Sequence, residues 1–462
     1  CDHTQSIYFK SAEAFRESYL KELSKAVHVI YMEYFILSEG LFFSEILDIL
    51  MDRMNHGVQV YLMIDDIGCI RTLPDGFEKK MQKLGIHIHI YNPLRKILSL
   101  NGNTRDHRKI TVIDNHCAFM GGNNLADEYI NRVKRYGHWK DSSIMLMGEA
   151  VKSFTLMFLQ MWNVDEKNPE FYKYLGYYGG NRNKSEGFVL PYGDWPLDDD
   201  KVGECVYIDI LNHAKEYVHI MSPYLILDDS MVSALCLAAK RGVDVRIVTP
   251  HRWDKFLVHM TTRSYYRELI RAGVKVYEYS NGFIHAKSFV SDDLIATVGT
   301  TNLDFRSLYL HFECGTWMYG SRAVMQVRED FVETLATCQQ IQETVGSIHI
   351  DQVGIQAILE HLDDAFGFVL AHQTVVDVYT NQLLADSLDQ QGGNDRGINT
   401  AGQCQQHFLI TNLCTDLLDL LIDKGICQLE IGDSSHGFRT YVTRHMNYPP
   451  IRIRVGFLMK IL

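Results

Sequence analysis

Two stretches of the sequence carry the same polar side chains at the same spacing. In each, a histidine is followed two residues later by a lysine and seven residues later by an aspartate, and an asparagine comes 17 residues after the histidine. The first set is His107, Lys109, Asp114 and Asn124, and the second is His285, Lys287, Asp292 and Asn302. One match could arise by chance, but two matches with the asparagine in register indicate a duplicated functional motif.

The spacing within each copy indicates how these side chains are presented. Residues two apart on an extended strand point to the same side, so His107 projects with Lys109, and His285 with Lys287. The apolar residues between each lysine and aspartate predict a buried strand. If two halves of the chain pack about a pseudo-twofold axis, both pairs face one cleft. A core histidine beside a solvated lysine would explain one copy equally well, but two copies in register favour a shared site.

These side-chain types suit a tetrahedral anion, most simply a phosphodiester. A neutral imidazole attacks phosphorus and forms a phosphohistidine, while an imidazolium across the site protonates the departing alkoxide. The roles then reverse when an alcohol or water attacks. Four side chains are expected to bind the non-bridging oxygens in the transition state: Lys109, Lys287, Asn124 and Asn302. The motif aspartates, Asp114 and Asp292, are counted in the catalytic set with the histidines and lysines.

A histidine nucleophile also needs a carboxylate that holds its other ring nitrogen and so fixes the tautomer. Asp141 lies downstream of the motif in the first copy, and Glu313 lies downstream of it in the second. We expect these two residues to orient the histidines. The alternative is that both are ordinary surface carboxylates.

The same repeat organises the surrounding chain, with a period near 180 residues. In each copy an apolar run is followed by a helical pattern, a glycine, a β-branched strand, a second helix, another glycine and a further strand. The glycines expected to end these helices in a left-handed conformation are Gly57, Gly85, Gly242 and Gly273. The strands expected after them are residues 58–64, 86–91, 243–248 and 274–279. This alternation predicts an α/β fold of two homologous lobes, each a mixed, mostly parallel sheet flanked by helices.

The repeat also sets the domain boundaries. We assign residues 1–163 to a first lobe, 164–201 to an interlobe loop and 202–342 to a second lobe. Residues 343–462 contain no copy of the repeat and differ in composition, so we attach no function to this tail. The interlobe loop holds an aromatic cluster that suits either a lipid interface or ordinary loop packing: Phe171, Tyr172, Tyr174, Tyr177 and Tyr178.

Composition disfavours several classes of function. The 462 residues are 46% hydrophobic and 22% charged, without a run of about 18 apolar residues that would form a transmembrane helix. The formal net charge of -12 argues against a nucleic-acid partner. Most of this charge lies in residues 343–438, where 14 acidic residues face two basic ones, so the rest of the chain is near neutral.

The cysteines and the first residue bear on metal content and location. The ten cysteines include no CxxC pair and no Cys/His spacing typical of zinc, so we expect no metal site. Scattered single cysteines are typical of small buried hydrophobes in a reducing compartment. The chain starts with Cys1 rather than methionine, so we expect the natural N-terminus, with any signal or anchor, to lie upstream.

These motifs resemble the phospholipase D superfamily, which is defined by a duplicated His-x-Lys-x4-Asp motif with a trailing asparagine. The resemblance covers nearly all of residues 5–342 and is greatest to bacterial cardiolipin synthases in residues 32–36, 139–141, 191–194, 262–266, 282–287 and 299–307. It implies transfer of a phosphatidyl group between two phosphatidylglycerol molecules, giving cardiolipin and glycerol without a metal or cofactor. It further implies that His107 is favoured over His285 as the nucleophile, with His285 as the acid and base, but the two motifs are alike and the sequence does not separate these roles. It also implies that the enzyme works at the bacterial cell membrane through an anchor outside this chain.

Other interpretations share the same catalytic core. A phospholipase D-type hydrolase would pass the phosphatidyl group to water, and exclusion of water from the site decides between the two outcomes. A phosphodiesterase or nuclease should carry a basic groove, which the near-neutral body disfavours. A catalytically inactive binding protein is disfavoured because both motifs are intact. We therefore expect a phospholipid substrate and a membrane surface as partners, and no nucleic acid. The resemblance does not extend to the tail, and Trp195 stands where relatives commonly have a small residue.

Overall fold

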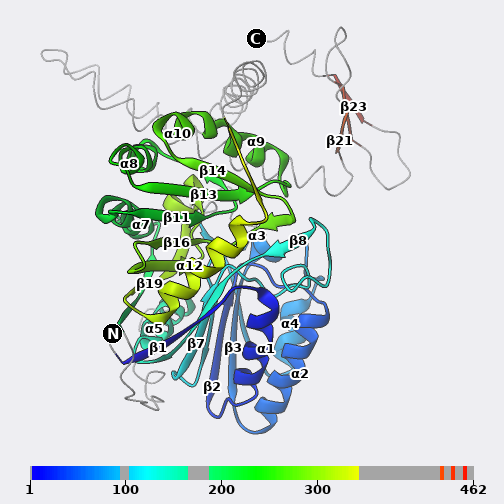
Figure 1. Cartoon of the computed structure of the whole chain (residues 1–462). Coiled ribbons are helices and arrows are strands. Elements are labelled where there is room, and N and C mark those ends of the chain that lie inside the picture. Colours follow the sequence, from blue (N-terminus) through cyan, green and yellow to red (C-terminus); the bar gives the residue numbers. More distant parts are fainter. Residues whose placement is uncertain are drawn as a thin grey trace, which may run out of the picture. The chain divides into compact units, whose positions relative to one another are not determined.

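The structure, a computed structural model, describes residues 3–93, 104–164 and 187–342 together with three short strands near the C-terminal end (Figure 1). The chain divides into two units, Cys1–Val345 and Gly346–Leu462. The described strands of the second unit form an antiparallel sheet and are β21 (Cys427–Glu430), β22 (Arg439–Val442) and β23 (Ile451–Arg454). The aromatic cluster of the interlobe loop and most of the tail lie outside the described residues.

The first lobe is built on a seven-stranded sheet in the order β1-β9-β7-β6-β2-β3-β4. Its strands are β1 (Thr4–Phe9), β2 (Val29–Tyr34), β3 (Gln59–Asp65), β4 (His87–Tyr91), β6 (Lys109–Ile113), β7 (Cys117–Gly121) and β9 (Ser143–Gly148). Its helices are α1 (Ala12–Leu23), α2 (Leu41–Asn55), α3 (Asp66–Cys69), α4 (Phe77–Lys83) and α5 (Val151–Trp162).

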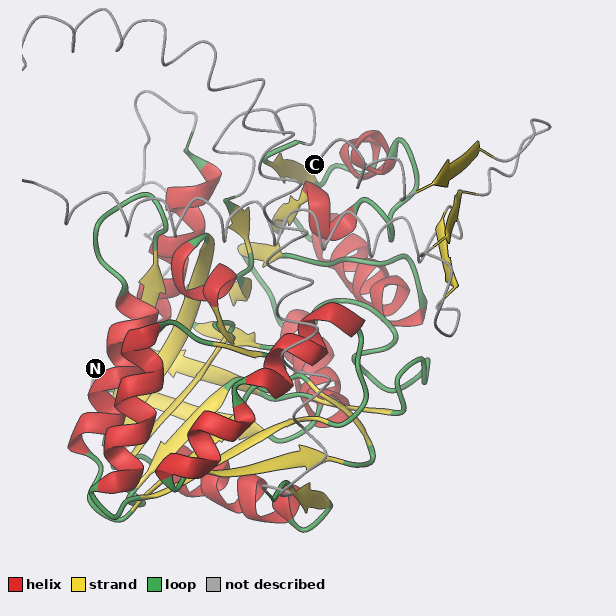
Figure 2. Ribbon diagram, turned by 90° about the horizontal axis from the view of Figure 1, so that it is seen from above, coloured by secondary structure: helices red, strands yellow, loops and turns green. Residues whose placement is uncertain are grey.

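The side chains of β2 point alternately to the two faces of the sheet, and helices cover both faces. Ile30 and Met32 pack with α1 and α2 in one apolar cluster, whereas Val29 and Tyr31 pack with α5 in another. Successive side chains of a strand point to opposite faces, so a strand that is buried on both sides reads as a continuous apolar run. Figure 2 shows the helices flanking the sheets.

The second lobe repeats this plan around a sheet in the order β10-β19-β17-β16-β11-β13-β14-β20. Its strands are β10 (Phe188–Asp194), β11 (Tyr217–Met221), β13 (Asp244–Pro250), β14 (Lys275–Tyr279), β16 (Ser288–Ser291), β17 (Ile295–Gly299), β19 (His311–Tyr319) and β20 (Cys338–Gln340). Its helices are α7 (Val202–His213), α8 (Asp229–Lys240), α9 (Phe256–Ser264), α10 (Tyr266–Ala272), α11 (Phe305–Tyr309) and α12 (Arg322–Leu335). A short parallel pair, β12 (Leu225–Ile226) and β18 (Leu303–Asp304), lies beside the sheet. Among all the described helices, none is both long enough and apolar enough to cross a bilayer.

The α/β class and the two homologous lobes are confirmed, but the expected predominance of parallel pairing is wrong. In the described main sheets, the parallel pairs within a lobe are β2-β3 and β3-β4 in the first lobe and β11-β13 and β13-β14 in the second, and the other main-sheet pairs within a lobe are antiparallel. The parallel strands are the ones joined by helices. The motif strand β6 instead turns directly into β7 at Asp114 and Asn115, both of which have positive φ, and a tight turn of this kind makes an antiparallel pair.

The two lobes are joined by two short strand pairs and by a shared core. Strand β5 (Arg105–Asp106) of the first lobe pairs with β19, and β8 (His138–Lys140) pairs with β15 (Gly282–Ile284) of the second. One apolar cluster includes Val112 and Phe158 from the first lobe with Val298 and Phe312 from the second. The lobes therefore form a single packed body rather than two domains on a linker.

Candidate active site

Each motif histidine follows one of the two strands that join the lobes. The His107 N–H donates to the Phe312 carbonyl at 3.0 Å, and the His285 N–H donates to the Lys140 carbonyl at 2.7 Å. Both side chains are nearly buried, at 7% and 6% exposure. The backbone of each histidine is thus fixed by the opposite lobe, and the register of the joining strands sets where the two rings lie.

The carboxylates that orient the histidines also come from the opposite lobe. His107 Nδ1 lies 2.9 and 3.1 Å from the two carboxylate oxygens of Glu313, and His285 Nδ1 lies 2.7 Å from Asp141 Oδ2. Both carboxylates are fully buried. The structure brings both expected residues to the histidines, with the pairs crossed between the lobes. A neutral ring that donates from Nδ1 has its lone pair on Nε2, which is the form that can attack phosphorus.

The motif lysines lie beside the histidines and are held by the same backbone. Lys109 Nζ donates to the His107 carbonyl and Lys287 Nζ to the His285 carbonyl. Lys287 Nζ is also 2.9 Å from His285 Nδ1. Burial is the main cause that lowers the pKa of Lys109 to about 8 and that of Lys287 to about 7. Desolvated cations of this kind are stabilised by an anion, so the pair is suited to bind a phosphate group.

The charged groups of the two half-sites influence each other. Burial lowers the pKa of His107 far below its usual value, and Lys109, Lys287 and His285 lower it further. The pKa of His285 is lowered to about 4, first by burial and then by Lys287, with Lys109 of the other lobe contributing. Both rings are therefore neutral near pH 7, and one of them gains a proton only when a negative charge arrives.

The two motif asparagines differ in their surroundings. Asn124 is fully engaged, because its Oδ1 accepts the Ile36 N–H at 3.0 Å and its Nδ2 donates to the Tyr129 hydroxyl at 2.7 Å. The ring of Tyr129 lies 5.5 Å from that of His285. Asn302 is buried, and among the described residues its Oδ1 has no hydrogen-bond partner. The unpartnered atom of Asn302 is an acceptor, so it is not itself a donor to a phosphate oxygen, and the Asn302 side chain also bonds Asp304. Asn124 contacts the wall of the site through Tyr129.

The motif aspartates do not lie with the histidines, which corrects their place in the catalytic set. The Asp114 carboxylate accepts the backbone N–H groups of residues 27, 28 and 29, and the Asp292 carboxylate accepts those of residues 215, 216 and 217. Seven residues of extended chain put each aspartate about 20 Å from its histidine. Both aspartates hold the chain where it enters the central strand, β2 or β11, so their role is to position the motif strand.

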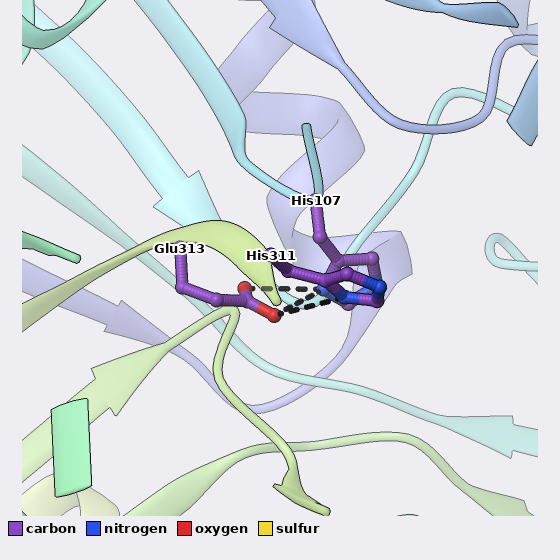
Figure 3. Close-up of side chains that lie close together, drawn as sticks. All are labelled: His107, His311 and Glu313. Atoms are coloured by element: carbon purple, nitrogen blue, oxygen red, sulfur yellow. Dashed lines mark hydrogen bonds and ion pairs between the residues drawn. The ribbon is translucent and has the colours of Figure 1, made fainter. Parts of the chain in front are cut away.

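Sequence reasoning missed His311, which shares Glu313 with His107 (Figure 3). The His311 ring is buried, lies 5.3 Å from that of His107, and has Nδ1 3.6 Å from Glu313 Oε1. Its Nε2 accepts from Arg306 Nε at 3.3 Å, so the proton is on Nδ1, which has no hydrogen-bond partner among the described residues. The signal that could have found it is spacing, because residues two apart on β19 share a face.

The three side chains in Figure 3 also have the composition of a metal site. The ligand atoms of His107, His311 and Glu313 lie within 4.8 Å of one another. The surroundings fit a metal ion poorly, however. The pKa of His311 is lowered first by burial and then by Arg306 and Lys109, so these two cations impose a positive potential on the cluster. That potential opposes a divalent cation and favours an anion.

The chain is similar to a known family and to several curated proteins. The chain matches a family model described as "Cardiolipin synthase, PLD-like domain" over residues 19–162 and 207–335. An uncharacterized protein of Streptococcus mutans is 49% identical over 339 residues, 73% of either chain. Cardiolipin synthases of Alkalihalophilus pseudofirmus and Halalkalibacterium halodurans are 35% and 36% identical over 323 residues, and the match spans 64% of the length of each.

A solved structure shares the fold at low sequence identity. Phosphatidylserine synthase of Haemophilus influenzae superposes with a TM-score of 0.59 at 14% identity, over 80% of this chain and 94% of that chain. The duplicated lobes, the two motifs in register and the family match over both lobes lead to one conclusion. The chain belongs to the phospholipase D superfamily, within its cardiolipin synthase-like family.

Proposed function

We propose that this protein is a phosphatidyltransferase that converts two phosphatidylglycerol molecules into cardiolipin and glycerol. The observation that carries the proposal is the crossed arrangement at the lobe interface. Each lobe contributes one histidine, one lysine and the carboxylate that orients the other lobe's histidine. Two neutral imidazoles beside two desolvated ammonium groups are suited to cleave and re-form one phosphodiester by two successive displacements.

In the first displacement, His107 Nε2 attacks the phosphorus of one phosphatidylglycerol molecule. The bond from phosphorus to the headgroup glycerol oxygen breaks, and His285 gives that oxygen a proton, which releases glycerol. Glu313 stabilises the positive charge that develops on the His107 ring, and the two lysines bind the non-bridging oxygens. Because the pKa of His285 is about 4 in the free protein, the negative charge of the bound substrate has to raise it before His285 can act as an acid.

In the second displacement, a headgroup hydroxyl of another phosphatidylglycerol molecule attacks the phosphohistidine. His285 takes the hydroxyl proton, the phosphorus–nitrogen bond breaks, and cardiolipin leaves. Glu313 also has the Thr300 hydroxyl and the His311 ring beside it, a polar environment that supports the assignment of His107 as the nucleophile. The low exposure of both histidines favours an alcohol over water as the acceptor, since a site that excludes water suppresses hydrolysis.

The proposal places the enzyme at the bacterial cell membrane, because both substrates and the product are membrane phospholipids. A hydrolase that releases phosphatidic acid is the alternative for the same chemistry. The full chain is to be incubated with phosphatidylglycerol vesicles, and the products are to be resolved as cardiolipin and phosphatidic acid. Cardiolipin with an equal amount of free glycerol is the expected result, and mostly phosphatidic acid would refute the transferase.

Replacing either motif histidine tests the site itself. His107→Ala and His285→Ala should each lower turnover by on the order of 10⁴-fold or more, because the two rings act as a unit. The matched control is His219→Ala, which removes a buried histidine of β11 outside the site and should leave turnover per folded molecule within a few-fold. Near-normal activity of either motif variant would disprove the proposed site.

A further inference from the structure

Two loops from different lobes meet next to the active site and form one exposed surface. Residues 132–136 precede β8 in the first lobe, and residues 251–256 connect β13 to the start of α9 in the second. Between them lies a pocket of about 710 Å³ whose walls include Arg135, Tyr136, His251, Arg252 and Trp253. We refer to residues 132–136 and 251–256 as the basic-aromatic surface.

The side chains of this surface combine exposed apolar groups with positive charge. Trp253, Phe256 and Val133 are 52%, 44% and 50% exposed, and the Trp253 and Phe256 rings lie edge to face at 5.8 Å. Arg132, Lys134, Arg135 and Arg252 are also exposed. Exposed aromatic groups beside basic side chains are the composition of surfaces that bind the interface of an anionic bilayer.

The one acidic residue in these loops does not offset the positive charge at the surface. The Asp254 carboxylate points inward, where it accepts the Tyr224 hydroxyl and the Lys255 N–H. The surface is therefore locally basic, because Arg132, Lys134, Arg135, Arg252 and Lys255 outnumber this one carboxylate. A local excess of positive charge attracts an anionic surface.

The basic-aromatic surface is one layer of rings away from the catalytic histidine. The Tyr136 ring lies 6.2 Å from that of Trp139, and the Trp139 ring lies 5.2 Å from that of His285. Tyr136 is also 6.1 Å from Phe283 on β15. A surface that contacts lipid at these loops holds the active site close to the headgroups.

We propose that the basic-aromatic surface docks this protein on a bilayer that contains anionic phospholipid. Trp253 and Phe256 insert at the level of the headgroups, and Arg135 and Arg252 bind headgroup phosphates at the mouth of the pocket. Arginine suits this role because its planar guanidinium forms paired hydrogen bonds with phosphate oxygens. The proposal rests on the proposed function in one respect: docking here brings the site to its lipid substrate.

Sedimentation of the full chain with vesicles tests the docking directly. The vesicles are phosphatidylcholine alone or phosphatidylcholine with increasing phosphatidylglycerol. Binding should rise with the anionic fraction and fall with added salt. The double variant Arg135→Gln/Arg252→Gln should bind anionic vesicles about 30-fold more weakly, at roughly 1 kcal/mol for each arginine. The double variant Trp253→Ser/Phe256→Ser should bind anionic vesicles more weakly than the arginine variant does. The control is Leu237→Ser/Lys240→Gln, which changes two exposed residues of α8 and should bind like the unmodified protein.

Activity on two forms of the substrate separates docking from catalysis. The arginine and aromatic variants should lose activity on vesicles but keep it on short-chain phosphatidylglycerol dissolved as monomers. Unchanged vesicle binding by both variants, equal binding to neutral vesicles, or preferential binding of nucleic acid would overturn the docking proposal. If the unmodified protein makes no cardiolipin from either form, the proposed function fails, and the sedimentation result still decides the docking.

Discussion

At the scale of single residues, the notable feature is that each motif histidine contacts a carboxylate from the other lobe. The pairs His107–Glu313 and His285–Asp141 are formed by residues 206 and 144 positions apart. The sequence singles out the two histidines by the repeated spacing, because histidine and lysine two apart on a strand project together. It offers Asp141 and Glu313 only as candidates downstream of the motifs. The sequence does not reveal that each histidine pairs with the carboxylate of the other lobe. That pairing depends on the register of β5 against β19 and of β8 against β15.

Removing the charge of an orienting carboxylate tests its role. Glu313→Gln should lower the maximal rate by about 10³- to 10⁴-fold with little change in KM, because an amide does not stabilise the imidazolium and permits the wrong tautomer. Asp141→Asn should have a comparable effect through His285. Steady-state kinetics on phosphatidylglycerol measure both, with Glu329→Gln on the exposed side of α12 as the control. A loss of only a few-fold for Glu313→Gln would show that His107 does not need this partner.

The lowered pKa values of the lysines predict a pH dependence. Lys287 has a pKa of about 7 and Lys109 of about 8, so each ammonium group is present below that pH and is lost as the pH rises through it. The ratio kcat/KM, which reports the free enzyme, should therefore decline above about pH 7, whereas kcat should decline only at higher pH because a bound phosphate raises both pKa values. A Lys287→Arg variant, which keeps its charge, should move the decline in kcat/KM upward. If kcat/KM stayed constant up to pH 9, the free enzyme would not need a protonated Lys287, which would contradict this prediction.

At the scale of elements, the motif strand is fixed at both of its ends by different means. Its first end is tied to the opposite lobe, and its last end is tied by Asp114 to the backbone that leads into β2. The sequence predicts the strand, its burial and the left-handed glycines Gly57 and Gly242, whose φ values are 91° and 97°. It misleads on the direction of the neighbouring strands, because the hairpin turn at Asp114 and Asn115 lacks the glycine that usually marks a two-residue turn.

The position of Asp114 predicts a loss of stability rather than of chemistry. Asp114→Asn tolerates the positive φ but removes the charge that holds three N–H groups, so it should lower the free energy of unfolding by about 1–3 kcal/mol. Turnover per folded molecule should stay within a few-fold. Denaturant unfolding and an activity assay on the same sample check both. A 10³-fold loss of turnover in protein of normal stability would return Asp114 to the catalytic set.

At the scale of the whole molecule, the two lobes share one core. The sequence predicts two lobes related by a pseudo-twofold axis with the site at their interface, but it does not show how much apolar surface the lobes bury against each other. The structure shows Lys140 of the first lobe paired with Asp330 of the second at 2.7 Å, and Tyr8 donating to the same carboxylate at 2.6 Å. Apolar side chains of both lobes lie in one cluster around these contacts.

A shared core predicts that the lobes unfold together. Amide hydrogen exchange under native conditions should give the same opening free energy for β6 in the first lobe and β16 in the second, because neither strand can be exposed while the common cluster stays packed. A variant that breaks the interlobe ion pair, Asp330→Ala, should lower both values equally. Two separate values, or a response confined to one lobe, would show that the halves are independent.

The crossed pairing also constrains how such a protein can have arisen. In each lobe, the histidine contacts a carboxylate of the other lobe. An ancestor that encoded one lobe would therefore have needed to form a dimer of two copies before its histidine was oriented. Fusion of those copies into one chain released the two halves from being identical. The two lobes now differ in this carboxylate, which is Glu313 beside His107 and Asp141 beside His285. The two imidazoles therefore have unequal surroundings, in which distinct roles can develop.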